Sequence, residues 1–185
     1  MSQAAELINK GNIRAIDSVK INHRFYFGVA GIGFDAQISW DFAEYGKRGF
    51  LSYVLLTLKN FPYYHPKTYS LSLDGIRISR EAFGISFANG SEFGNGAAIA
   101  PMAKIDDGYL DVVILKRFPL YAGVGIAWRL FNQTLHKSRY VEQFRCKEVV
   151  INEANLKAHI DGEPVLFPDG LRLQVVPSSL KVLVP

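Results

Sequence analysis

The chain has 185 residues, of which 49% are hydrophobic and 21% charged, and its net charge at pH 7 is +4. This is the size and composition of one ordinary folded domain, and it excludes a disordered or fibrous protein. One cysteine, Cys146, excludes an internal disulfide and a multi-cysteine metal site, and no stretch reaches the roughly 18 apolar residues of a membrane span.

The N-terminal part of the chain predicts the end of a helix and then strands. Residues 4–10 suit a short helix that ends at Gly11, and residues 13–21 favour a strand with apolar side chains on one face. A chain that begins with the end of a helix has the pattern of a truncated protein. We therefore expect residues 1–12 to be the tail of a helix from a missing domain. A second strand is expected at residues 24–30.

Residues 35–61 form the main region of helical periodicity, which a Gly-Lys-Arg-Gly segment at residues 46–49 interrupts and Pro62 ends. Lys47 and Arg48 therefore lie in an exposed connector between two helices. Such charges usually mark only a solvated surface, and they would also suit an anionic bilayer.

From Lys67 onward the pattern turns to strands: Tyr69, Leu71 and Leu73 alternate in one strand, and Ile76 and Ile78 begin the return strand. Asp74-Gly75 predicts a type I′ hairpin turn, and residues 81–88 favour a strand with Phe83, Ile85 and Phe87 on one face. A further strand is expected at residues 109–115. Together, two strands therefore flank the glycine-rich run that begins at Asn89.

The last third predicts a helix and several short strands. Residues 119–135 have the apolar spacing of an amphipathic helix, and a polar link follows it. Five short strands are then expected at residues 148–152, 156–160, 163–167, 171–176 and 180–184. The fold class is therefore mainly β with a few helices (α+β), as a sandwich or a rolled sheet, in a single domain over residues 1–185.

The run from Asn89 to Leu115 combines glycines, two adjacent acids and a hydrophobic strand. Glycines permit positive φ angles or a close approach of the backbone to a ligand, and carboxylates are ligands that hard cations prefer. Asp106-Asp107-Gly108 also has the composition of a simple turn, and Asp161-Gly162 is a second type I′ hairpin signal. Glu163 then opens the return strand, and His159 on the preceding strand is more often packed than a ligand.

Four motifs follow one another along the chain. They are Gly33-Phe-Asp-Ala36, Asn89-x-Ser91-x-x-Gly94-x-Gly96, Pro101-x-Ala103-x-x-Asp106-Asp107-Gly108-Tyr-Leu-Asp-Val-Val, and Asp161-Gly162-Glu163. In this order they resemble the C-terminal part of the bacterial diacylglycerol kinase and sphingosine kinase family of lipid kinases. The resemblance extends from Ile13 to Pro185. The motif that begins at Pro101 is specific, whereas the shorter motifs are persuasive only because they occur in this order.

The resemblance implies the β-sandwich-like second domain of the NAD kinase and diacylglycerol kinase-like fold, which receives the lipid. In that family the N-terminal domain binds ATP through a Gly-Gly-Asp-Gly-Thr motif, and this sequence contains no such motif. The resemblance therefore implies a phosphotransferase as the parent protein and an inactive isolated chain. By position, Glu163 resembles the general base, and Asp107 resembles a structural Mg²⁺ ligand together with the carbonyls of Lys104 and Tyr109.

The implied partners are a lipid substrate and a peripheral membrane surface, with ATP bound mainly by the missing domain. A lipid groove is expected between residues 50–61 and the strand that carries Phe83, Ile85 and Phe87. Nucleic acid is not expected, because no basic stripe is interleaved with aromatics. Edge strands would allow a homodimer. Two alternatives stay open: a stand-alone lipid-binding or structural β-domain without catalysis, and a dinucleotide kinase, against which the Asp-Asp-Gly-Tyr run argues.

Overall fold

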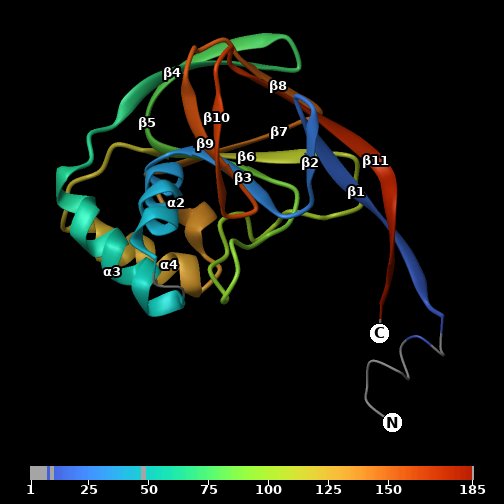
Figure 1. Ribbon diagram of the computed structural model, residues 1–185, viewed down its shortest axis with the longest axis horizontal. Coiled ribbons are helices and arrows are strands. Elements are labelled where there is room, and N and C mark those ends of the chain that lie inside the picture. Colours follow the sequence, from blue (N-terminus) through green and yellow to red (C-terminus); the bar gives the residue numbers. More distant parts are fainter. Residues whose placement is uncertain (1–7, 9–10, 47–48, 185) are drawn as a thin grey trace.

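The computed structural model describes residues 8, 11–46 and 49–184. Among these residues, eleven strands form one curled sheet, and three α-helices gather beside it (Figure 1). Most of the predicted helix tail at residues 4–10, and both Lys47 and Arg48, lie outside the described residues. The prediction of a mainly β domain with a few helices is confirmed.

The bounds of the elements, in chain order, are as follows. They are β1 (Ile13–Ile21), β2 (Arg24–Tyr26), β3 (Val29–Gly33), α2 (Phe34–Tyr45), α3 (Phe50–Asn60), a 3₁₀ turn η1 (Phe61–Tyr63), β4 (Lys67–Leu73), β5 (Ile76–Ala88), β6 (Leu110–Lys116), α4 (Ala122–Phe131), η2 (Leu135–Lys137), β7 (Val141–Cys146), β8 (Glu148–Ile151), β9 (Leu156–Ile160), β10 (Glu163–Phe167) and β11 (Leu171–Leu183).

The sheet follows the order β10-β9-β3-β5-β4-β8-β11-β1-β2, and β6 joins β5 to β7 outside this path. Every pairing is antiparallel. Strands that lie far apart in sequence become neighbours: β3 pairs with both β5 and β9, which places the β9–β10 turn next to the start of β3. The curl encloses the main hydrophobic core, to which Tyr26, Phe87 and Leu173 contribute fully buried side chains.

The helices pack on the outer face of the sheet through two further clusters. Phe34 and Ile38 of α2 meet Phe83 of β5, together with Phe61 of η1. Ile126 and Leu130 of α4 pack against a separate group around Val113 of β6. In Figure 1 the three helices lie together on one side, and β1 and β11 extend away from them.

Both predicted type I′ turns are confirmed. Asp74 and Gly75 have φ angles of 47° and 86°, and Asp161 and Gly162 have φ angles of 46° and 88°. Positive φ at both central positions is what this turn requires, and it matches the right-handed twist of the flanking strands. The flanking of the glycine-rich run by two paired strands, β5 and β6, is also confirmed.

Several predicted strands have different limits in the structure. The second strand is split into β2 and β3, whereas the strands around Ile76 and Phe83 are one continuous strand, β5. The final two predicted strands are likewise joined in β11. Strand β7 lies in the segment interpreted as a polar link, because only three of its six residues, Val141, Phe144 and Cys146, are apolar.

The prediction that Phe83, Ile85 and Phe87 share one face is wrong. Ile85 and Phe87 point into the main core, whereas Phe83 packs on the outer face with Phe34. A register shift between Ala82 and Gly84, where β5 pairs with β6, breaks the alternation. Strict period-2 counting cannot anticipate such a bulge.

Candidate functional site

The turn between β9 and β10 is fixed by the side chain of Asp161. Its carboxylate accepts hydrogen bonds from the backbone N–H groups of Phe27 (3.2 Å), Gly28 (3.0 Å) and Val29 (3.0 Å). A Cβ atom at Gly28 would lie 2.8 Å from an Asp161 oxygen, so a larger residue there would displace the carboxylate from these bonds. Asp161 therefore joins the turn to the start of β3. In this way it sets the position of Glu163, the first residue after the turn.

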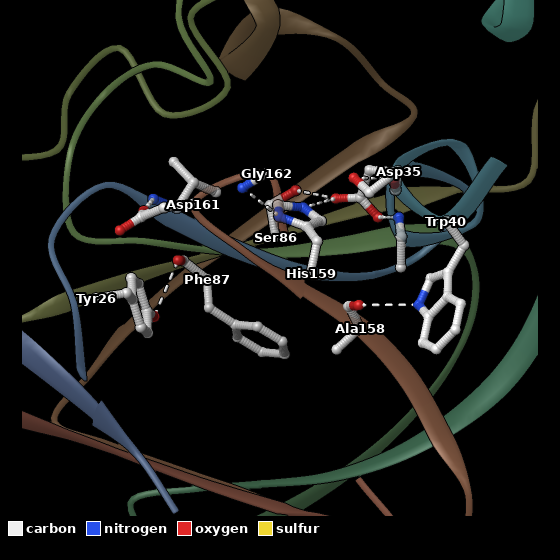
Figure 2. Close-up of polar contacts among 12 residues, drawn as sticks. Tyr26, Asp35, Trp40, Ser86, Phe87, Ala158, His159, Asp161 and Gly162 are labelled. Carbon is white, nitrogen blue, oxygen red and sulfur yellow. Dashed lines mark hydrogen bonds and ion pairs between the residues drawn. The ribbon is translucent and has the colours of Figure 1, made fainter. Parts of the chain in front are cut away.

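Next to this turn lie two polar side chains that contact each other, the buried His159 and the partly buried Asp35 (Figure 2). His159 is only 3% exposed, and its Nε2 lies 3.3 Å from the Asp35 carboxylate. Ser86 donates a hydrogen bond to the same carboxylate oxygen at 3.3 Å, and the N–H of Gly162 donates to His159 Nδ1 at 3.4 Å. The histidine thus connects α2 to the hairpin turn.

Gly31 of β3 makes room for this contact. A Cβ atom at position 31 would collide with the Asp35 carboxylate and would lie 2.7 Å from His159 Nε2. Asp35 is itself held by its position in the first turn of α2, where its Oδ1 accepts the N–H of Ala36 at 2.8 Å. Both glycines of this segment therefore permit close packing. Gly31 lies under the side chains of Asp35 and His159, and Gly33 lies against the backbone of β5.

Tyr26 and Trp40 complete the polar contacts around the hairpin in Figure 2. The Tyr26 hydroxyl donates to the carbonyl oxygen of Phe87 at 3.1 Å, and Trp40 Nε1 donates to the carbonyl of Ala158 at 3.3 Å. Burial, and then the neighbouring Asp161 charge, raise the pKa of Tyr26 well above its usual value. Tyr26 is therefore a neutral structural donor and not an acid or base.

An aromatic cavity adjoins the first turn of α2. Gly33, with a φ of 95°, lies so close to Gly84 that its neighbour Phe34 is directed onto Phe83, with ring centroids 4.5 Å apart. The cavity has a volume of about 500 Å³. Most of its lining is aromatic or proline, and two lining residues, His65 and Arg117, can carry charge. The lining residues are Phe61, Pro62, Tyr64, His65, Pro66, Phe83, Arg117, Phe118, Pro119 and Leu120.

This cavity overlaps the expected lipid groove only at Phe61, which follows α3, and at Phe83 of the sheet. Phe83 is part of its lining, whereas Ile85 and Phe87 are not, because they face the core. The first turn of α2 therefore contributes to two different surroundings. Phe34 packs on Phe83 and Phe61 beside the cavity, and the next residue, Asp35, contacts His159. Apolar volume next to a few convergent polar groups is the usual composition of a small-molecule site.

The acidic loop before β6 is organised by a buried aspartate that the sequence did not reveal. Asp17 of β1 is 1% exposed, and its two carboxylate oxygens accept the N–H groups of Gly108 (2.7 Å) and Ser178 (2.8 Å). Its own backbone N–H donates to the carbonyl of Ile105 at 2.7 Å. Position 17 reads as one polar residue in a strand, and only the folded chain shows what it binds.

Hydrogen bonds connect this loop to the β9–β10 turn. Asn89 donates through Nδ2 to the carbonyl of Asp17 at 3.1 Å, and its backbone N–H donates to the carbonyl of Gly28 at 3.0 Å. Gly28 in turn donates to Asp161. The Asn89 motif, the acidic loop and the Asp161 turn, which are remote in sequence, thus form one continuous polar framework.

Asp107, the predicted Mg²⁺ ligand, is already in contact with a cation. Its Oδ2 lies 2.5 Å from the Arg145 guanidinium, and its Oδ1 accepts the N–H of Tyr109 at 3.1 Å. The guanidinium also lies over the Tyr109 ring, 4.6 Å from its centroid. One carboxylate and two backbone carbonyls suit Mg²⁺ chemically, and here the carboxylate attracts positive charge. The residues fit a cation, provided that Arg145 moves aside.

Asp111 lies behind that ion pair, opposite Arg145 in the β6–β7 register. Burial raises the pKa of Asp111, although the Arg145 charge works against this shift. Among the described residues, no cluster of three or more His, Cys, Asp or Glu side chains is arranged to hold a metal. The predicted Mg²⁺ ligand set is of another kind, because it combines one carboxylate, Asp107, with two backbone carbonyls.

Glu163 lies at the first position of β10, paired with Ile160, and its side chain is exposed. Lys104 and Tyr109 are also exposed, at the two ends of the acidic loop. The structure therefore brings Asp107, Lys104 and Tyr109 into one loop and places Glu163 on a separate, connected turn. Sequence reasoning missed Asp17, and it did not pair His159 with Asp35; the glycine at position 31 was the available signal.

No helix in the described part of the chain is long and apolar enough to cross a membrane.

Comparison with known proteins gives a consistent result. A family described as the YegS C-terminal NAD kinase beta sandwich-like domain matches residues 28–184. A probable lipid kinase YegS-like protein of Shewanella frigidimarina is 25% identical over 185 residues, which cover 97% of this chain and 59% of that protein. A diacylglycerol kinase of Bacillus subtilis is 23% identical over 87% of this chain and 54% of its own length.

Solved structures agree on the fold. A putative diacylglycerol kinase from Bacillus anthracis superposes with a TM-score of 0.78 at 22% identity, covering 98% of this chain and 60% of that chain. A second structure with the same description gives a TM-score of 0.72. The chain thus spans about three-fifths of the length of such proteins.

Proposed function

Since the chain belongs to the family of YegS C-terminal NAD kinase beta sandwich-like domains, we propose that it is the lipid-receiving domain of an ATP-dependent lipid kinase. The reaction is transfer of the ATP γ-phosphate to a lipid hydroxyl. ATP is bound mainly by another domain, because the Gly-Gly-Asp-Gly-Thr motif is absent from this sequence. The isolated chain is then inactive.

One structural observation supports a lipid alcohol as the acceptor. The aromatic cavity of about 500 Å³ and the polar Asp161 turn lie on either side of the first turn of α2. An amphiphile with an apolar tail and a hydroxyl head has the same two-part character. The cavity takes part of the acyl chain, and the hydroxyl lies toward the hairpin turn.

Glu163 is the proposed general base that takes the proton from the acceptor hydroxyl. Phosphoryl transfer needs positioning, proton removal and neutralisation of charge, and little covalent chemistry from the protein. The Asp161 bonds to β3 and the His159 contact with Gly162 hold the turn that carries Glu163. Because Glu163 is exposed in this chain, its partial desolvation comes from the bound lipid and the ATP-binding domain.

The direct test is phosphate transfer by a protein that contains this chain together with an ATP-binding domain. We expect Glu163→Gln to lower turnover by about 10² to 10⁴-fold, the usual contribution of a general base, with ATP binding unchanged. Ile76→Gln is the matched control, because Ile76 follows the other Asp-Gly turn and is also exposed. Retained turnover in the Glu163 variant would remove this residue from the mechanism.

For Mg²⁺, Asp107 is the proposed carboxylate ligand, with backbone carbonyls of Lys104 and Tyr109. Bound there, the ion would neutralise Asp107 and hold the two ends of the acidic loop together. We expect Mg²⁺ to raise the melting temperature of the chain and Asp107→Ala to abolish that increase. An equal response of both proteins to Mg²⁺ would exclude this ligand set.

A further inference from the structure

The solvent-facing sides of α3 and α4 carry large apolar side chains. On α4 and just before it, Tyr121, Val124, Trp128 and Phe131 recur at three- and four-residue spacing and are all exposed. On α3, exposed leucines recur in the same way at positions 51, 55 and 58. Residues at this spacing occupy one face of a helix, so each helix presents an apolar stripe to solvent.

These stripes do not result from a failure of the helices to pack. The opposite side of α4 contributes Ile126 and Leu130 to the cluster around Val113, and Leu56 of α3 is buried. Surface helices of soluble domains are normally polar on the side that faces water. A helix that is apolar on both sides needs a second apolar environment.

The two stripes belong to adjacent elements. Gly123 of α4 packs against the ring of Phe61, the residue that directly follows α3, so closely that a Cβ atom would lie 2.6 Å from the ring. Leu120 and Phe61 also line the same aromatic cavity. In Figure 1, α3 and α4 lie together on the side away from β1 and β11. The end of α3 and the start of α4 thus meet beside the cavity assigned to the lipid, which Phe61 and Leu120 line.

The two chain segments that contain α3 and α4 carry charges of one sign. The sequence contains no Asp or Glu from residue 45 to 73, which includes α3, or from residue 112 to 141, which includes α4. The same two segments hold nine of the chain's 21 Lys and Arg residues, including Lys59 on α3 and Arg129 on α4. Exposed apolar area among basic residues without acids is typical of helices that lie in the interface of an anionic bilayer.

We propose that the α3–α4 face, defined by Leu51, Leu55, Leu58, Tyr121, Val124, Trp128 and Phe131, docks on an anionic lipid bilayer. The helices lie in the plane of the interface, because 11 and 10 residues are far too few to span it. This inference rests on the proposed function, since a lipid acceptor has to be taken from a bilayer, and docking here places the cavity at the membrane surface.

Vesicle sedimentation with the full chain tests the proposal without any phosphate transfer. We expect binding to vesicles of phosphatidylcholine with about one-third phosphatidylglycerol and much weaker binding to phosphatidylcholine alone, with the difference lost at high salt. Trp128 is 61% exposed, so its emission shifts to the blue on the mixed vesicles. Equal binding to both vesicle types, or binding to neither, would overturn the proposal.

Three single substitutions locate the surface. Leu58→Glu in α3 and Val124→Glu in α4 should each weaken vesicle binding at least tenfold, because each places a charge where an apolar side chain enters the interface. Ile76→Glu is the matched control: Ile76 is 70% exposed, as Leu58 is 65%, but it lies at the β4–β5 turn, away from the helices. Since all three residues are exposed, the variants should keep the melting temperature of the parent chain.

Two results would assign the face elsewhere and overturn the proposal. One is equal vesicle binding by all three variants. The other is a parent chain that ignores vesicles but forms dimers that Leu58→Glu dissociates, because the face would then cover a second copy. A failure of the proposed phosphate transfer leaves vesicle binding unchanged, so the two hypotheses fail separately.

Discussion

Two Asp-Gly turns in this domain have almost the same backbone and different surroundings. In the β4–β5 turn, Asp74 accepts the N–H groups of Lys147 (2.9 Å) and Glu148 (2.8 Å) and so holds the start of β8. In the β9–β10 turn, Asp161 holds the start of β3 in the same manner. Each aspartate therefore shapes its own turn and also ties that turn to a strand remote in sequence.

What separates the two turns is the layer beneath them. Under the Asp161 turn lie His159 and Asp35, and through Asn89 the same turn is connected to the acidic loop. No hydrogen bond joins the Asp74 turn to a buried histidine among the described residues. A local dipeptide thus specifies a conformation, and the tertiary neighbours decide which polar groups surround each of the two turns.

The largest effect is expected from breaking that layer. Gly31→Ala places a methyl group against the Asp35 carboxylate and His159 Nε2, so one of the two has to move. Such overpacking around the buried His159 should cost about 2 kcal/mol in the free energy of unfolding. Urea denaturation followed by tryptophan fluorescence measures this cost.

Gly90→Ala is the control for that substitution, because a Cβ atom at Gly90 meets nothing closer than 3.7 Å. It should change the unfolding free energy by no more than about 0.5 kcal/mol. If the two variants were equally stable, Gly31 would not be needed for the contact between Asp35 and His159. The proposed support of Glu163 through that contact would then lose its structural basis.

Much of the fold could be predicted from the sequence because it is encoded locally. The two type I′ turns need positive φ at adjacent positions, and Asp-Gly is the dipeptide that supplies it. Strand alternation likewise predicted β1, β4, β9 and β10 to within a residue or two. These features depend on neighbours in the chain, so they survive without knowledge of the packing.

The rest of the fold depends on contacts that no local pattern contains. Strand β7 is polar on the outside, and its register is set by β6. Phe83 changes faces because of the irregular pairing after Ala82. For the candidate site, the motifs predicted Asp107 and Glu163 by resemblance, and those roles stay predictions. Asp17 carries no motif, and its importance follows only from the partners that folding brings to it.

A smaller effect compares the two aspartates directly, through Asp161→Gly and Asp74→Gly. Glycine accepts φ values of 46° and 47° without strain, so both substitutions remove a carboxylate and leave the turn intact. The added freedom of the unfolded chain is the same in both variants and cancels in the comparison.

What remains is the difference between three backbone N–H groups that lose Asp161 and two that lose Asp74. Since hydrogen bonds to charged groups contribute about 1.5–3 kcal/mol when buried and less when exposed, we expect Asp161→Gly to be the more destabilising by about 1 kcal/mol. Paired urea titrations measure the difference, and equal midpoints would show that the bond to the buried Val29 adds nothing that water does not replace.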